Sequence, residues 1–581
     1  FLSSRDGDKG HALYGISVDG GEATRLFGHE SSIKEYAIHP DGKRLVFTAS
    51  EKDDNGAGTN KTKGFNQEIY EEQVQATTLW FASLDTPDAK AKQVAIDGAV
   101  SEIAWSPDGM KLSVAIAPSA RIDDHYMARK VHVLSAAGKV LARVDNPGKM
   151  GQVAWSPDSS QLAIISAADL NDPRDGRILI VSASGGKGTM LLGNWKGHVQ
   201  SIAWRDPSTV VFIGAQGTGS IIAQIPAKGG EVKHLAGPRG TFLTKLSLAN
   251  DGRSFAAVGE SPAHPREPFR GVLGKKAKKL TDHNPWIKKV RMAKQEVIRH
   301  NAKDGLELEG ILIWPLDYKE GTRYPLVLQV HGGPESFVPN GWLTGYSHMG
   351  QVGAARGFAV FYPNYRGSTG RGVAFSKLGQ ADAAGKEFDD LVDAVDHFVS
   401  TGLADTKRVG ITGGSYGGYA SAWGATKYSD RFAASVMFVG ISDKISKAGT
   451  TDIPNEEFLV HARKRMWDDW QWYLERSPIF HVKNGKTPTL ILHGKKDTRV
   501  HPSQSMALYR HLKVLGKVPV RLVFYPDEGH GNRNAASRLD YNLRLLRWME
   551  RYLKRTGDAV PKLPKKAINY KASWKATTPV Q

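Results

Sequence analysis

A short turn motif, Trp-Ser-Pro-Asp-Gly followed by a strand-like run, recurs through the first half of this 581-residue chain and constrains its fold more than any other feature. Pro and Asp-Gly favour a tight turn. The residues after the turn alternate apolar and polar with period two, as a half-buried strand does. Copies stand at 38–42, 105–109 and 155–159, with weaker ones at 204–207 and 248–252. Repeats made only of strands bury their faces by packing radially, so the array predicts an all-β propeller.

The spacing of the copies locates one long insertion. Positions 108 and 158 are 50 residues apart, 155 and 204 are 49 apart and 204 and 248 are 44 apart, but 41 and 108 are 67 apart. The excess of about 20 residues lies in 51–76, and such an insertion is either a tolerated surface loop or a functional one. Residues 1–7 read as the end of a strand, so we expect part of one blade to precede residue 1.

The pattern changes near Leu280, and from about Glu296 single strands alternate with helices. Helices are predicted at 386–401 and 537–554, where apolar residues recur with the spacing of one helix face. This alternation predicts a doubly wound, mostly parallel sheet. The strands that we expect in this half are 324–330, 358–362, 408–412, 487–493 and 518–525.

The sharpest motif is Gly-Gly-Ser-Tyr-Gly at 413–417, which fits G-x-S-x-G. It directly follows the strand at 409–412 and precedes a helical stretch at 419–427, which is the context of a nucleophile elbow. The glycines leave room for a serine on a strained, sharp turn, and the start of a helix favours developing negative charge. We therefore predict Ser415 as a nucleophile, in preference to a tight turn without chemistry.

A serine hydroxyl needs a base, and the base needs a carboxylate that orients it. In the fold that carries this elbow the chain order is Ser, then Asp or Glu, then His. Asp497 follows a predicted strand 82 residues after Ser415, and His530 follows the next strand 33 residues later. We predict these two as acid and base. The competing side chains, which we interpret as structural or turn-shaping, are His493, His501, Asp527 and Glu528.

An oxyanion hole requires two N–H donors that point at one spot. Tyr416, the residue after the nucleophile, offers one backbone N–H. His331-Gly332-Gly333-Pro334, after the strand at 324–330, matches the H-G-G type of loop that offers the other. Gly333 is the best candidate because a glycine lets the backbone approach closely. The alternative is an ordinary strand-ending turn.

Five motifs in this order, after a propeller, resemble the prolyl oligopeptidase family of serine peptidases. The resemblance covers nearly the whole chain and is nearest to the branch with acylaminoacyl-peptidases and bacterial dipeptidyl-peptidases. Together with the repeats and the change of pattern near Leu280, it predicts a propeller at 1–285 and an α/β-hydrolase domain at 286–560, and the composition adds a basic tail at 561–581. The motifs are HGGP (331–334), NYRGSTG (364–370), GGSYGGY (413–419), HGKKDTRV (493–500) and DEGHG (527–531).

The resemblance also implies roles for single residues. Ser415, Asp497 and His530 match the catalytic triad, and Gly333 and Tyr416 match the oxyanion donors. Arg499 matches an arginine that binds the carbonyl of the substrate residue P2, although a surface arginine packed on the turn is the alternative. The implied activity is cleavage of short peptides, with the propeller excluding folded proteins.

Cleavage near a free N-terminus is the specific mode that we expect, with release of dipeptides or other short N-terminal units. Glu71 and Glu72, with Glu68, lie in the insertion and could grip an α-ammonium group. The arrangement resembles the paired glutamates of dipeptidyl-peptidases, and a solvated loop is the alternative. Acylaminoacyl-peptidase, oligo-endopeptidase or esterase activity stays open, as does a propeller binding protein with an inactive hydrolase domain. An aromatic cluster fits core packing as well as a pocket: Trp467, Trp470, Trp472 and Tyr473.

Composition excludes several other classes. The chain has no Cys, which rules out disulfides, thiolate metal sites and cysteine nucleophiles, and we expect neither a cofactor nor a metal. The net charge is +19, but no aromatic-interleaved reading motif accompanies the basic stretch at 270–299, so we expect no nucleic-acid partner. No apolar run approaches the roughly 18 residues of a membrane span. A homo-oligomer is open, and a periplasmic or secreted location is expected, with a cytoplasmic one as the alternative.

Overall fold

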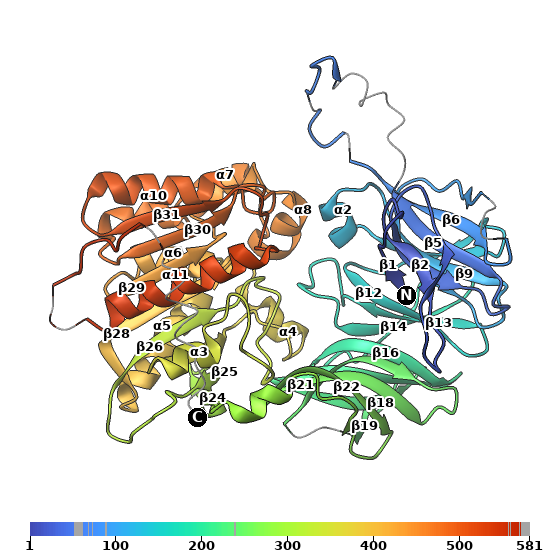
Figure 1. Ribbon diagram of the computed structural model, residues 1–581, viewed down its shortest axis with the longest axis horizontal. Helices are drawn as coiled ribbons and strands as arrows, with labels where there is room; N and C mark the ends of the chain where they lie inside the picture. Colours follow the sequence, from blue (N-terminus) through green and yellow to red (C-terminus); the bar gives the residue numbers. More distant parts are fainter. Residues whose placement is uncertain are drawn as a thin grey trace.

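The computed structural model shows two domains that lie side by side, a propeller and an α/β-hydrolase domain (Figure 1). Among the described residues, no helix is both long and apolar enough to cross a membrane. The structure describes residues 1–50, 62–67, 69–72, 74–86, 90–236, 240–555, 557, 559–566, 568 and 570.

The propeller has six blades in the described part of the chain, which confirms the fold predicted from the repeats. Five blades are four-stranded antiparallel sheets, and the first is three-stranded. The strands, blade by blade, are β1 (Leu2–Ser3), β2 (Ala12–Gly15) and β3 (Thr24–Phe27); β4 (Ile33–Ile38), β5 (Arg44–Ser50), β6 (Thr77–Ser83) and β7 (Lys92–Gln93); β8 (Ala99–Trp105), β9 (Lys111–Ala117), β10 (Lys130–Ser135) and β11 (Val140–Arg143); β12 (Met150–Trp155), β13 (Gln161–Ser166), β14 (Arg177–Ser182) and β15 (Thr189–Leu191); β16 (His198–Asp206), β17 (Thr209–Gln216), β18 (Gly219–Pro226) and β19 (Lys233–Ala236); β20 (Phe242–Leu248), β21 (Ser254–Ser261), β22 (His264–Val272) and β23 (Lys278–Lys279).

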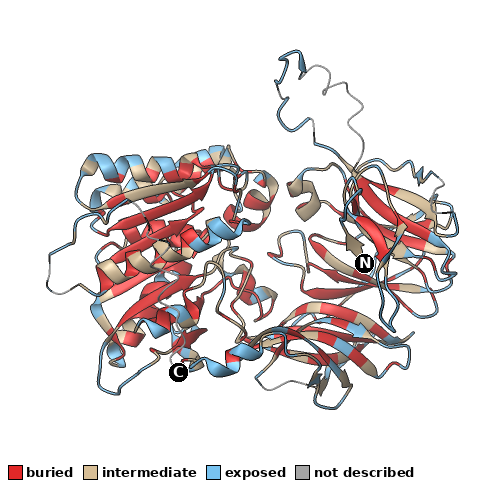
Figure 2. Cartoon of the chain, viewed as in Figure 1, coloured by how far each residue is buried: buried red, intermediate tan, exposed pale blue. Residues whose placement is uncertain are grey.

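The tryptophan of the repeat joins neighbouring blades, a role that the turn chemistry of the motif did not reveal. In three copies its indole N–H donates to a backbone carbonyl on the first strand of the preceding blade. The pairs are Trp105 to Ala37 (3.3 Å), Trp155 to Ala104 (3.0 Å) and Trp204 to Ala154 (2.9 Å). Many strand residues of the blades are buried (Figure 2), and buried residues of successive blades pack together in shared hydrophobic clusters. The repeat therefore encodes both the turn inside a blade and the contact between blades.

The hydrolase domain is built on one eight-stranded sheet within the described residues, in the order β24-β25-β27-β26-β28-β29-β30-β31. From β27 to β31 all neighbours are parallel, as predicted, and β24 and β25 add an antiparallel edge. The strands are β24 (Gln295–Asn301), β25 (Glu307–Ile313), β26 (Tyr324–Val330), β27 (Ala359–Asn364), β28 (Ala404–Gly414), β29 (Ala434–Phe438), β30 (Thr489–Gly494) and β31 (Val520–Tyr525).

Helices cover both faces of this sheet. α5 and α6 pack on one buried face, and α3 and α11 pack on the other. The helices are α2 (Ile122–Met127) in the propeller, then α3 (Gly350–Ala355), α4 (Val373–Ser376), α5 (Lys386–Ser400), α6 (Tyr416–Thr426), α7 (Lys444–Ala448), α8 (Pro454–Glu456), α9 (Trp470–Glu475), α10 (Ser503–Leu515) and α11 (Ala535–Leu553). Shorter helical turns are η1 (Pro285–Lys289), η2 (Lys377–Gly379), η3 (Glu457–Ala462), η4 (Met466–Asp468) and η5 (Pro478–Asn484).

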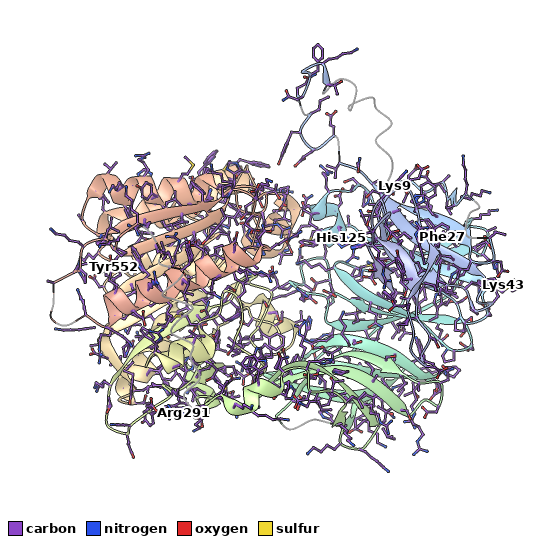
Figure 3. All side chains as sticks on the ribbon, in the orientation of Figure 1. Lys9, Phe27, Lys43, His125, Arg291 and Tyr552 are labelled. Carbon is purple, nitrogen blue, oxygen red and sulfur yellow. The ribbon has the colours of Figure 1, made fainter. Side chains whose placement is uncertain are left out.

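The two domains meet at α2, a short helix that projects from the third blade. Figure 3 shows its His125 on the side of the propeller that faces the hydrolase domain, whereas Lys43 lies at the far edge. The carboxylate of Asp123 accepts hydrogen bonds from the backbone N–H groups of Asn455 (2.7 Å) and Glu456 (3.0 Å), at the start of α8. The propeller thus caps a helix of the other domain.

The contact between blades predicts a stability effect for Trp204→Phe. Phenylalanine keeps most of the buried ring but leaves the carbonyl of Ala154 without the indole donor. We expect the free energy of unfolding in urea to fall by about 1–2 kcal/mol, since a buried acceptor loses its partner. Trp467→Phe is the matched control, because Trp467 is 67% exposed. Equal effects of the two substitutions would contradict this role of the repeat tryptophan.

Candidate active site

Ser415 lies on a sharp turn between β28 and α6. Its φ of 58° and ψ of −119° fall in a region that side chains rarely adopt. The neighbouring glycines are required by close backbone contact: a Cβ on Gly413 or Gly417 would lie 2.4 or 2.1 Å from the carbonyl oxygen of Val330. The sharp turn at Ser415 therefore depends on Gly413 and Gly417, because no larger residue fits beside the carbonyl of Val330.

His530 and Asp497 form a direct pair, with 2.8 Å between His530 Nδ1 and Asp497 Oδ2. The other carboxylate oxygen of Asp497 accepts from the backbone N–H groups of Arg499 and Val500, each at 3.0 Å. Burial opposes ionisation of Asp497, but hydrogen bonds from His493 and His530 outweigh it and lower its pKa to about 2. The carboxylate is thus a fixed anion that holds the imidazole of His530.

His493 contacts this carboxylate as well, which sequence reasoning missed. The side chain is fully buried, and its Nε2 lies 3.1 Å from Asp497 Oδ2, while Nδ1 lies 2.6 Å from Ser505 Oγ. His501 is exposed and turns to Ser503. The signal that could have identified His493 is its place at the end of a strand buried along its whole length, where a polar side chain needs a partner.

The two acids near His530 shape the turn around it. Glu528 is buried and accepts from the backbone N–H groups of Arg533 (2.7 Å) and Asn534 (3.1 Å). Asp527 is exposed and pairs with Lys496. Neither takes the place of Asp497 beside the imidazole.

The loop after β26 lies against the serine. A Cβ on Gly332 would come within 3.2 Å of the Cβ of Ser415 and 2.8 Å of the carbonyl oxygen of Gly414, so only glycine allows this approach. Gly333 follows with a φ of 125°, again a conformation that favours glycine. Tyr416 begins α6, and its hydroxyl donates to Glu387 at 2.7 Å. Gly333, Tyr416 and Ser415 thus line the same cavity.

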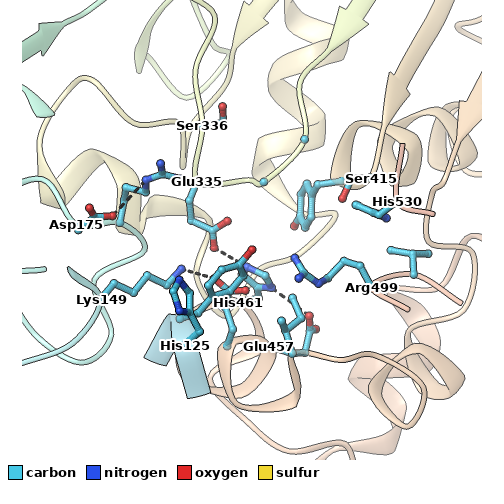
Figure 4. A pocket seen from close by; sticks show the side chains of 18 of the residues that line it. His125, Lys149, Asp175, Glu335, Ser336, Ser415, Glu457, His461, Arg499 and His530 are labelled. Atoms are coloured by element: carbon cyan, nitrogen blue, oxygen red, sulfur yellow. Dashed lines mark hydrogen bonds and ion pairs between the residues drawn. The ribbon is translucent and has the colours of Figure 1, made fainter. Parts of the chain in front are cut away.

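A cavity of about 700 Å³ lies between the two domains and contains this site. Figure 4 shows Ser415 and His530 on its hydrolase side. The propeller contributes His125, Tyr126, Arg129, Lys149, Met150, Arg174 and Asp175. The hydrolase domain contributes Gly332, Gly333, Glu335, Ser336, Ser415, Tyr416, Ile441, Lys447, Ile453, Glu456, Glu457, His461, Arg499, Val500 and His530. A space of this size lies within the range of ligand-binding pockets in proteins, about 300–1,000 Å³.

Arg499 reaches this cavity from the loop after β30. Its Nε lies 2.5 Å from Asp452 Oδ1, and its guanidinium carbon lies 5.2 Å from the ring centre of Tyr126, which belongs to the propeller. One edge of the guanidinium is held while the group lines the cavity. Its place is compatible with the predicted contact to a substrate carbonyl.

Glu71 and Glu72 do not line this cavity, and both are exposed. Glu71 Oε2 lies 3.5 Å from Arg121 Nη1, and Glu68 lies outside the described residues. Their role as an amine anchor stays a prediction.

The aromatic cluster is divided: Tyr473 is buried, but Trp467 and Trp470 are more than half exposed, so core packing does not explain the set. Among the described residues, no group of three His, Asp or Glu side chains is arranged to hold a metal ion.

A strained serine, a histidine–carboxylate pair and two converging loops on a parallel sheet define a serine hydrolase of the α/β-hydrolase fold. Residues 344–556 match the prolyl oligopeptidase family. The chain is 30% identical to the uncharacterized peptidase YuxL of Bacillus subtilis, across 99% of this chain and 87% of that protein. It is 36% identical to dipeptidyl aminopeptidase BIII of Pseudoxanthomonas mexicana, across 44% of this chain and 38% of that protein.

A solved acylaminoacyl peptidase of Pyrococcus horikoshii has the same fold, with a TM-score of 0.79 at 21% identity across 94% of this chain and 86% of that one. The chain therefore belongs to the prolyl oligopeptidase family and is a serine peptidase. The resemblance noted from its motifs is confirmed.

The pair of Asp497 and His530 predicts how the rate depends on pH. Asp497 stays ionised throughout the neutral range, because its pKa lies at about 2. A histidine that serves as the general base must be neutral to accept a proton, so acidification should lower the rate while Asp497 stays charged. We expect kcat/KM for a peptide substrate to fall with a single-proton limb between about pH 8 and 5. A rate that is constant over this range would argue against a histidine base.

Asp497→Asn gives the matched test of orientation. An amide at this position cannot hold the imidazole as a carboxylate does, so kcat should fall by about 10⁴-fold. KM should change little, because Asp497 is buried behind His530 and does not line the cavity. A rise in KM of similar size, in place of the fall in kcat, would indicate a role in substrate binding.

Proposed function

We propose that this serine peptidase hydrolyses short peptides through an acyl-enzyme on Ser415. His530, oriented by Asp497, accepts the proton of the serine hydroxyl and then returns it to the leaving amine. The backbone N–H groups of Gly333 and Tyr416 stabilise the oxyanion. A water molecule then attacks the acyl-enzyme by the reverse sequence of proton transfers. The observation that carries this mechanism is that His530, which pairs with the buried Asp497, lines the same cavity as the strained Ser415.

The size of the substrate follows from the cavity. The catalytic serine lies inside a space of about 700 Å³, with propeller side chains opposite it. Arg499 lines that space and supplies a donor for a peptide carbonyl, while Asp452 fixes its position. These features favour a short peptide over a small ester, which would need neither the enclosure nor a carbonyl clamp.

Release of short N-terminal units is the cleavage mode that we favour. Two relatives support it by name, a dipeptidyl aminopeptidase and an acylaminoacyl peptidase. The cavity offers a different amine partner from Glu71 and Glu72. Asp175 lines it from the propeller, and its nearest ion pair, to Arg174, is long at 3.4 Å. Burial raises the pKa of Asp175, so a substrate ammonium would stabilise its charge.

Ser415→Ala should abolish turnover and leave the fold intact. The hydroxyl is the atom that forms the acyl-enzyme, so we expect kcat to fall by several orders of magnitude, about 10⁶-fold at most. A fluorophosphonate probe should label the wild-type chain and not the variant. Residual activity within about tenfold of wild type would exclude Ser415 as the nucleophile. Absence of labelling in the wild type would favour a binding protein with an inactive hydrolase domain.

The cleavage mode is tested with a dipeptidyl chromogenic substrate and its N-acetylated twin. If a free amine is recognised, wild type should prefer the free substrate, and Asp175→Asn should weaken that preference by about tenfold through loss of one charge-assisted hydrogen bond. Glu71→Gln and Glu72→Gln are the matched variants outside the cavity. A loss confined to these two would support the insertion as the anchor, and equal cleavage of both substrates would favour an acyl-peptide or internal mode.

A further inference from the structure

A second buried charge cluster borders the cavity and has no part in the mechanism above. His461, in η3, lies between two carboxylates: Nε2 is 2.5 Å from Glu335 Oε1, and Nδ1 is 3.1 Å from Glu457 Oε2. All three side chains are less than a tenth exposed. Figure 4 shows Glu335, His461 and Glu457 in the centre of the cavity view, joined by dashed lines.

This geometry requires a charged imidazole. A neutral ring has one N–H and could donate to only one of the two carboxylates, whereas an imidazolium donates to both. Burial opposes the charge, but Glu335 and Glu457 outweigh it and raise the pKa of His461 to about 9. The same contacts hold the pKa of Glu335 below its usual range, against the effect of burial.

Glu335 connects the cluster to the oxyanion loop. It stands two residues after Gly333, and the turn between them is tight, since a Cβ on Gly333 would lie 2.3 Å from the backbone nitrogen of Glu335. The preceding Gly332 lies against Ser415. A displacement of Glu335 would therefore be transmitted over a few bonds to the N–H group that is proposed to bind the oxyanion.

The opposite side of the cluster is held by cations of the hydrolase domain. Glu457 forms ion pairs with Lys444 and with Lys447, whose Nζ lies 2.5 Å from Glu457 Oε2. Both lysines belong to α7 and are buried. The backbone carbonyl of His461 also accepts from Ala381 at 2.9 Å. The imidazolium is therefore fixed between a rigid anchor and the loop.

The propeller fixes the start of the same segment. Lys149, from the fourth blade, forms an ion pair with Glu456, the residue before η3, and donates to the carbonyl of Pro173 at 2.8 Å. Asp123 caps the backbone N–H groups of Asn455 and Glu456. These contacts link the docked propeller to the position of the histidine. The imidazole is faced by Glu457 from its own segment, by Glu335 from the loop after β26 and by the ring of Tyr416, 6.3 Å away. Around these groups, Lys444 and Lys447 pair with Glu457, and the charge of Lys149 acts on Glu335.

We infer that His461 is a positioning residue for catalysis: its imidazolium holds Glu335, and through it the backbone N–H of Gly333, in the geometry that stabilises the oxyanion. The propeller, through Asp123 and Lys149, fixes the segment that carries His461. The inference rests on the proposed function, because it assigns Gly333 to the oxyanion hole. A cluster that served only the stability of the fold would not affect transition-state binding selectively.

His461→Gln and Glu335→Gln test this role in the full-length chain. Loss of one oxyanion donor costs about 10²–10³-fold in kcat, so a displaced donor should cost about 10- to 100-fold. KM should stay within about threefold, and the order of preferred substrates should not change. The affinity of a peptide boronate, whose adduct oxygen occupies the hole, should fall in parallel with kcat/KM. Unchanged kcat and boronate affinity, or a changed order of substrates, would overturn the proposal.

The alkaline limb of the rate gives a second readout. The charge of His461 is present below a pH of about 9 and is lost as the pH rises through this value. Wild-type kcat should therefore fall above about pH 9, and His461→Gln should lack this limb and show a low rate that does not change across the alkaline range. His300→Gln is the control, because His300 is a buried histidine of β24 outside the cavity. Its variant should retain the limb and the boronate affinity, and the same losses there would indicate a general effect on the fold.

The charge of His461 can be measured without activity. Imidazole ¹⁵N shifts, assigned by difference with His461→Gln, should show a doubly protonated ring at about pH 7.5, above the usual histidine pKa of about 6.5. A neutral ring would overturn the inference even if the proposed function holds. Failure of wild type to react with a fluorophosphonate would instead reject the proposed function. If the cluster variants do not fold, Asp123→Asn, at the edge of the segment, should lower kcat by about threefold with unchanged KM, and no change would count against the propeller link.

Discussion

The parallel pairing of β26 with β28 is the interaction on which the site depends. It sets Val330 opposite Gly413, so that the loop after one strand and the elbow after the other leave the sheet at the same edge. The carbonyl of Val330 then lies so close to the elbow that no side chain fits at Gly413 or Gly417. The sheet register thus brings Ser415 close to the loop that carries the predicted oxyanion donor Gly333, before any side chain of the site is considered.

The second constraint is the closure of the cavity by another domain. Contacts between the domains near the site are mainly polar: a carboxylate that caps α8, a lysine–glutamate pair and an arginine over a tyrosine ring. Such contacts cost desolvation and give little net stability. They do fix the relative position of the groups that they join. The propeller therefore contributes to the geometry of the wall that encloses Ser415.

Sequence patterns predicted the features that backbone geometry dictates. The elbow, the glycine loop and the order of Ser415, Asp497 and His530 follow from local conformational demands, and the repeat turns predicted the propeller. The buried strand of His493 could have indicated that this side chain needs a partner, but neither its contact with Asp497 nor the contacts of His461 could be predicted, because each depends on residues brought together by the tertiary fold. Glu71 and Glu72 show the opposite case, in which the sequence predicts a binding role but cannot place the residues relative to the cavity. Residue type and spacing placed them in an insertion, but only the fold could tell that they lie outside the cavity.

The ionic character of the cavity explains why most of the residues that line it could not be predicted from the sequence. Apolar pockets leave a periodic trace in strands and helices, whereas a wall of paired charges resembles solvated surface until the partners are known. Lys149 and Glu456 stand far apart in the sequence, in different domains, and each would be costly to bury alone. Their pairing lets charged residues line a buried space. The cavity can then stay hydrated and adapt to the polar backbone of a peptide, which an apolar wall would leave without hydrogen-bond partners.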